Sequence, residues 1–143
     1  MDGAFWKGPA EEAIDARGNR ALIGFSRTAF CIAVRGHLTT TLSDRIQIVG
    51  NRAITEIGKI WICCDWSEMT AYDSRARTDL TRWALDRDRS IHGLHIVVAT
   101  PIVRMGVSVA SMFLKRLTSY ETRAAFLRAF DELESGRAGS GAK

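Results

Sequence analysis

Short apolar runs alternate with longer segments of helical period along most of this 143-residue chain. The run at 60–64, Ile-Trp-Ile-Cys-Cys, is short and rich in β-branched and aromatic residues, which predicts a strand buried on both faces. A similar run at 94–99 follows a glycine. Between these runs, apolar residues recur at steps of three and four, as they do in amphipathic helices. Strands that alternate with helices favour a mostly parallel sheet with right-handed crossovers.

Helix start and stop signals agree with this order. Thr41 and Asp44 have the spacing of a capping box, Gly58 ends the first helical pattern, and Thr100-Pro101 places an N-cap before a proline at the first helical position. We therefore expect a single α/β domain with a mostly parallel central sheet of four to five strands and about four helices. The predicted strands are 21–24 (an edge strand), 29–34, 60–64, 94–99 and 117–120, and the predicted helices are 42–57, 74–89, 101–114 and 121–134.

The two ends of the chain lack these patterns. Residues 1–20 have no clean period and carry three glycines and a proline, which predicts a loosely ordered extension before a domain at 21–134. Residues 135–143 are rich in glycine and serine and nearly free of apolar groups, which predicts a disordered tail.

Charge and cysteine content limit the classes of partner and compartment. The net charge is +4, but the arginines of segment 74–89 are interleaved with aspartates, which is typical of a solvated helix face rather than a nucleic-acid surface. Three cysteines, two of them adjacent, do not form a disulfide framework and suit a reducing cytoplasm. The apolar stretch 94–114 is interrupted by His95, Pro101 and Arg104, so it does not predict a membrane span. We expect a cytoplasmic protein without nucleic-acid or membrane partners.

Enzyme motifs are weak in this sequence. Asp65 at a strand end is placed like the phosphoacceptor of a receiver domain, but Gly36-His37-Leu38 stand where an acidic pair is required, and Asp65-Trp66-Ser67 is not the Asp-x-Asp of a haloacid-type phosphatase. The three histidines lack zinc-site spacing, and no C-x-x-C, P-loop or nucleophile-elbow pattern is present. We expect no enzymatic activity, no metal and no cofactor.

The segment 65–72 is rich in hydroxyl and carboxylate groups and is predicted to be a loop between a strand and a helix. Open α/β sheets keep their functional groups at such a junction. A phosphate on Ser74, at the start of the helix, would meet free backbone N–H groups and the positive end of the helix dipole. Arg77, one turn later, is placed to add a charge-assisted contact. A simpler interpretation is that Asp73 and Ser74 only form a cap and a turn.

The pattern Asp65-x-Ser67-x5-Asp73-Ser74-x-Ala76 resembles the D-x-S-x5-D-S-x-G signature of STAS domains, the fold of bacterial anti-sigma factor antagonists. The similarity extends over the layout of residues 29–133. It implies that Ser74 is the phosphoacceptor for a partner kinase that is also the anti-sigma factor. It also implies that Asp73 lies beside the acceptor and that Asp65 and Ser67 shape the loop.

The chain departs from that signature at three positions that follow the acceptor. Arg75 replaces the usual second serine, Ala76 replaces the glycine, and Arg77 replaces an apolar residue. Two arginines at the front of the helix alter the partner surface and favour a more acidic partner.

Two functions therefore stay open at this point. The first is a phospho-switched protein-interaction module that binds an anti-sigma factor, a serine kinase or a related STAS protein. The alternative is a STAS-like scaffold or small-ligand domain, binding a nucleotide or a lipid and self-associating as a homo-oligomer, with Ser74 as a mere cap.

Overall fold

The computed structural model describes residues 3–136 and forms one six-stranded sheet in the order β1-β2-β3-β4-β5-β6. β2 runs antiparallel to both of its neighbours, β1 and β3, and β3 to β6 are parallel. This confirms the predicted α/β class and mostly parallel sheet, with six strands in place of four to five. The strands are β1 (Ala10–Ile14), β2 (Arg20–Phe25), β3 (Ala29–Leu38), β4 (Ile60–Tyr72), β5 (Ile91–Val98) and β6 (Leu117–Tyr120). The helices are α1 (Thr40–Ile57), α2 (Ser74–Asp86), the short 3-10 helix η1 (Asp88–Ser90), α3 (Pro101–Ser111) and α4 (Arg123–Glu134).

The N-terminal segment differs from its prediction. The sequence predicts a loosely ordered extension at residues 10–14, but these residues form β1. This strand pairs antiparallel with residues 20–24 of β2. Trp6 is also buried, at 6% exposure. Pairing to a neighbouring strand supplies the backbone hydrogen bonds that the local pattern does not announce, and it makes β2 an inner strand rather than the predicted edge strand. Of the predicted tail at 135–143, residues 137–143 lie outside the described part of the chain.

The polar segment 65–72 is strand and not the predicted loop. β4 continues to Tyr72 because β3 also runs on to Leu38 and pairs with it throughout, across register shifts after Ala33 and after Gly36. These bulges break the strict alternation of buried and exposed residues that identifies a strand in sequence.

Two of the predicted helix start and stop signals are confirmed. Thr100 accepts a hydrogen bond from the Val103 N–H with Pro101 at the first turn, and Gly58 ends α1 with a φ of 97°. The predicted capping box at Thr41 is wrong, since the helix begins two residues earlier and Thr39 is the N-cap, accepting from the Leu42 N–H.

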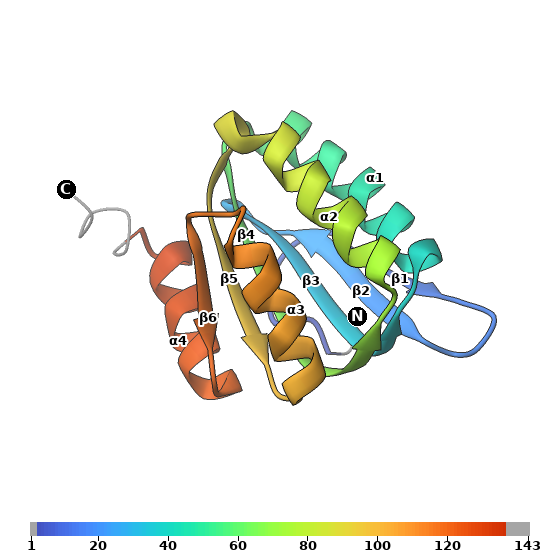
Figure 1. Cartoon of the computed structure of the whole chain (residues 1–143). Coiled ribbons are helices and arrows are strands. Elements are labelled where there is room, and N and C mark those ends of the chain that lie inside the picture. Colours follow the sequence, from blue (N-terminus) through green and yellow to red (C-terminus); the bar gives the residue numbers. More distant parts are fainter. Residues whose placement is uncertain (1–2, 137–143) are drawn as a thin grey trace.

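Two layers of helix cover the sheet (Figure 1). α1, α2 and α3 cover one face, here called the three-helix face, and bury Leu42, Trp83 and Val103 against the sheet. α4 covers the other face, here called the α4 face, together with Phe5 and Trp6. No helix within residues 3–136 is long and apolar enough to cross a membrane.

Candidate functional site

The N-terminus of α2 lies at the carboxyl edge of the parallel strands, where β4 ends at Tyr72. Asp73 takes the N-cap position with φ −75° and ψ 134°, and its backbone N–H donates to the Leu38 carbonyl at 2.9 Å. Its carboxylate makes no capping hydrogen bond and lies instead 2.7 Å from Nε2 of His37. β3 thus positions His37 to hold the carboxylate, and α2 begins without a side-chain cap.

Ser74 is the first residue of α2 and is exposed. Its own carbonyl is occupied by the hydroxyl of Thr78 at 2.9 Å, a contact within the helix. The neighbouring Arg75 also points to solvent, with a side chain 84% exposed and Nε 3.9 Å from the Asp79 carboxylate. Asp73, Ser74 and Arg75 therefore form one accessible edge, here called the α2 edge.

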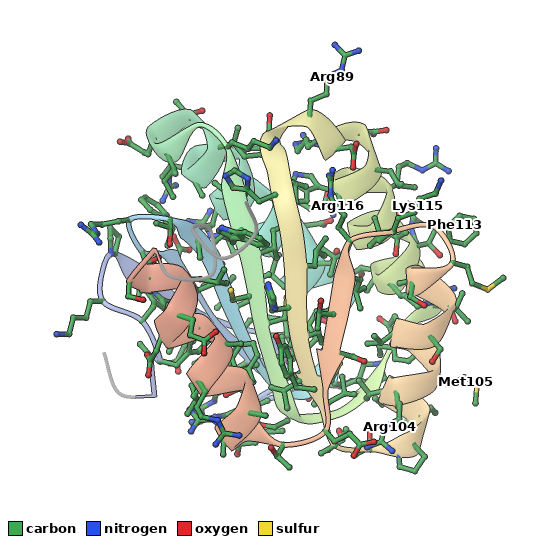
Figure 2. All side chains as sticks on the ribbon, turned by 90° about the vertical axis from the view of Figure 1, so that its left-hand side faces the viewer. Arg89, Arg104, Met105, Phe113, Lys115 and Arg116 are labelled. Atoms are coloured by element: carbon green, nitrogen blue, oxygen red, sulfur yellow. The ribbon has the colours of Figure 1, made fainter. Side chains whose placement is uncertain are left out.

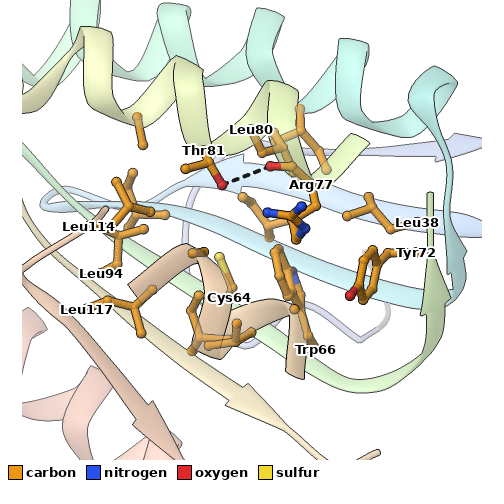
Figure 3. A pocket seen from close by; sticks show the side chains of 18 of the residues that line it. Leu38, Cys64, Trp66, Tyr72, Arg77, Leu80, Thr81, Leu94, Leu114 and Leu117 are labelled. Carbon is orange, nitrogen blue, oxygen red and sulfur yellow. Dashed lines mark hydrogen bonds between the residues drawn. The ribbon is translucent and has the colours of Figure 1, made fainter. Parts of the chain in front are cut away.

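The next two predicted site residues leave this edge. Ala76 is fully buried in the core of the three-helix face, so the prediction that it belongs to the partner surface is wrong. Arg77 is half-buried and extends into the space between α2 and α3, as Figure 3 shows. The helical period of α2 turns Ala76 inward, because it follows Ser74 by about half a turn. Arg77 is on the side of α2 that also carries Leu80 and Thr81 toward the cavity.

Asp65 and Ser67 lie on the opposite side of the sheet from α2. Asp65 is 7% exposed, its Oδ2 accepts from Nε of Arg123 at 2.7 Å, and its Oδ1 accepts from the Ser67 hydroxyl at 2.6 Å. Arg123 is the first residue of α4, so this cluster ties the helix to β4. The predicted role of Asp65 and Ser67 in shaping a loop beside Ser74 is wrong, because β4 is continuous there and the two residues face α4.

A cavity of about 70 Å³ lies between α2, α3 and the sheet. Its walls are almost entirely apolar and include Trp66, Leu80, Leu94 and Val107. The indole Nε1 of Trp66 is buried and has no hydrogen-bond partner among the described residues. Arg77 and Trp66 point toward each other across this space (Figure 3).

The outer side of α3 carries exposed apolar side chains. Ile102 is 51% exposed, Met105 63% and Phe113 56%, and Figure 2 shows Met105 and Phe113 directed away from the body beside Arg104 and Lys115. Surface apolar groups that gather in this way mark interaction sites more often than scattered ones do.

A glycine lets α3 approach the α2 edge closely. A Cβ on Gly106 would lie 2.7 Å from the ring of Tyr72, the residue just before Asp73. The buried side of α3 therefore packs directly against the residue that precedes the α2 edge.

Burial shifts the pKa values of the three cysteines and of His95 toward their neutral forms. Burial is the main cause that raises the pKa of the Cys31, Cys63 and Cys64 thiols, so each stays a neutral, unreactive thiol. Burial also lowers the pKa of His95, whose Nδ1 lies 2.8 Å from the Tyr120 hydroxyl. Within residues 3–136, no three His, Cys, Asp or Glu side chains gather to hold a metal ion.

Sequence reasoning missed the partners of the two aspartates. No sequence pattern connects His37 with Asp73 or Arg123 with Asp65, because these pairs are 36 and 58 residues apart. The one available signal was that His37 follows a predicted strand, 29–34, by three residues, since carboxyl ends of parallel strands meet at one edge.

Comparisons with known proteins support the fold. No protein-family profile and no curated protein matches the sequence. Among solved structures, an uncharacterized protein of the DUF3478 family with a SpoIIAA-like fold, from Shewanella loihica, superposes with a TM-score of 0.62 at 16% identity, over 81% of this chain and 98% of that one. The anti-sigma factor antagonist SpoIIAA in its unphosphorylated form superposes with a TM-score of 0.55 at 12% identity, over 88% of this chain and 98% of that one. The chain thus has a SpoIIAA-like fold, consistent with a STAS-like domain.

Proposed function

We propose that this chain is a non-enzymatic protein-interaction module whose partner docks on the α2 edge and is released when Ser74 is phosphorylated. The single observation that carries the proposal is the exposed hydroxyl of Ser74 at the first position of a helix without a side-chain cap. The SpoIIAA-like fold supports a protein partner of the anti-sigma factor or serine-kinase kind.

The local geometry suits a switch by charge. With the Asp73 carboxylate held by His37, the first backbone N–H groups of α2 are free of a side-chain cap and are placed to receive phosphate oxygens. The helix dipole adds only about 0.3–1 kcal/mol at such a surface site. Covering a dianion with a partner surface that offers no counter-charge costs several kcal/mol, so the dominant effect is release of the partner.

The docking surface extends from the α2 edge onto α3. Ile102 and Met105 are exposed apolar side chains of α3, and Arg75 on α2 and Arg104 on α3 are exposed positive charges. This combination favours a partner that presents an apolar patch rimmed by acidic groups.

Mass spectrometry of the protein isolated from its own cells, with its cross-linked partner, tests the proposal first: phosphate is expected on Ser74. The recovered partner is then titrated against variants by calorimetry. Ser74→Ala is expected to keep the affinity, and Ser74→Glu to lose at least about tenfold, equivalent to about 1.4 kcal/mol.

Thr55→Glu is the matched control, because Thr55 is exposed in the last turns of α1, at the end of that helix remote from the carboxyl edge. It adds the same charge and is expected to leave the affinity unchanged. Equal affinities of Ser74→Ala and Ser74→Glu would refute the switch.

A further inference from the structure

The cavity between α2 and α3 has the features of a ligand site that the phospho-switch does not use. Its walls are apolar, and protein interiors seldom leave such space empty. It also holds a buried donor, Nε1 of Trp66, that has no partner among residues 3–136, and buried polar groups of that kind require an explanation.

One charged group reaches the cavity. Arg77 is half-buried, its guanidinium points into the space over Trp66, and it makes no ion pair within the described part of the chain. By contrast, Arg75 on the same helix lies outside the cavity, and Arg87 bonds Asn51 and stacks on Trp83. A guanidinium presents two parallel N–H donors that match a carboxylate.

The size of the cavity restricts the body of the ligand. At about 70 Å³ it has room for roughly five to seven water-sized probes, which suits part of a slender aliphatic chain and not a nucleobase or a sterol ring system. Besides Arg77 and Trp66, the described residues of its walls with a side-chain nitrogen or oxygen are Tyr72, Thr81 and Trp83. The Thr81 hydroxyl already donates to the Arg77 carbonyl, and the Trp83 indole N–H to the Asn51 side chain. This also disfavours a nucleotide, since most polar groups of a ribose and its phosphates would be left unsatisfied there.

We propose that this cavity binds an aliphatic carboxylic acid, with the chain inserted between α2 and α3 and the carboxylate paired with Arg77 near the Trp66 indole. The site rests on the walls of the cavity and on Arg77, independently of phosphorylation at Ser74. Because Tyr72 and Arg77 flank the α2 edge in sequence, an occupant would lie directly behind the proposed docking surface.

Octanoate is the probe, and octan-1-ol and octylammonium are its matched controls of equal chain length. Binding is followed by the indole N–H signals in nitrogen–proton correlation spectra of the full chain. The Trp66 signal is expected to shift saturably with octanoate. The Trp6 signal is expected to stay, since its indole already donates to the Pro9 carbonyl on the α4 face.

Charge-matched variants test the role of Arg77. Arg77→Gln is expected to weaken octanoate binding by about tenfold or more while octan-1-ol binding stays the same. Arg75→Gln, which removes the same charge two residues earlier, is expected to change neither.

Three results would overturn the site: no saturable shift of the Trp66 signal, equal binding of octanoate and octylammonium, or equal effects of Arg77→Gln and Arg75→Gln. Ser74→Glu separates the two proposals: it is expected to weaken partner binding and to leave octanoate binding unchanged, so either proposal can fail while the other holds.

Discussion

Where Phe5 meets α4, aromatic rings fill the space over the sheet, whereas on the three-helix face α2 and α3 leave a cavity between them. Phe5 lies 5.2 Å from Phe126 and 5.1 Å from Phe130 between ring centroids, both edge to face, which is a favourable arrangement for aromatic pairs. Across the sheet, the indole N–H of Trp66 lies beside the cavity and finds no acceptor in the described part of the chain. The packing thus differs between the two faces: aromatic rings fill the space next to α4, and space is left between α2 and α3.

The same contrast holds for the charged groups. On the α4 face, Asp65 is buried and paired with Arg123 at 2.7 Å, so its charge is used within the fold. At the start of α2, Ser74 and Arg75 are exposed at the surface. A motif that is continuous in sequence is thus divided between a structural pair and an accessible edge.

The largest expected effect is the loss of stability when an aromatic ring on the α4 face is removed. Phe126 is fully buried, and Phe126→Ala is expected to lower the free energy of unfolding by about 3–5 kcal/mol, measured by urea denaturation. Phe113→Ala is the control, because Phe113 is 56% exposed, and it is expected to change stability by no more than about 0.5 kcal/mol. Similar losses for both would show that the rings on the α4 face do not carry the stability.

Substitution of a buried alanine by leucine on each face compares how tightly the two faces are packed. Ala29 is fully buried on the α4 face, and Ala29→Leu is expected to cost about 1–3 kcal/mol by overpacking. Ala110 borders the cavity, and Ala110→Leu is expected to be neutral or to stabilise by about 0.5–2 kcal/mol by filling it. Thermal unfolding of the two variants measures both changes, and losses of equal size would mean that the two faces are packed alike.

The smallest expected effect concerns the edge of the sheet next to α1. Hydrogen bonding to Arg45 is the main cause that lowers the pKa of Glu11, with Nε 2.5 Å from the carboxylate. A lowered pKa in the folded state means that the pair stabilises the fold above the ordinary glutamate value of about 4.3 and that this stability is lost as the pH falls through the lower, folded value.

Glu11→Gln is therefore expected to reduce stability slightly at pH 7 and to flatten its decline with acid below about pH 4.3, as followed by urea midpoints across that range. Glu12→Gln is the neighbouring control, since Glu12 pairs only loosely, at 3.6 Å, with Arg20. If Glu11→Gln leaves the dependence of stability on pH unchanged, the pair between Glu11 and Arg45 does not contribute to stability.

Sequence patterns determined the class of fold and most of its elements. The apolar runs, the helical stripes, Gly58 and Thr100-Pro101 are local signals, because strand burial, helix amphipathicity and capping depend on residues within a few positions of one another. For the same reason the exposed start of α2 at Ser74 was predictable. β1 and the continuation of β4 were not, since both are held by pairing with strands whose own patterns lie elsewhere in the chain.

The side of the sheet on which each site residue lies was decided only by the tertiary structure. Asp65 and Ser74 are nine positions apart, yet the pleat of β4 turns the first toward α4 and the turn at Asp73 presents the second on the other side. The cavity is also a tertiary feature, because its walls come from α2, α3 and the central strands. Side-chain direction follows from the backbone locally, but which groups meet depends on packing between distant segments, and no local pattern encodes that packing.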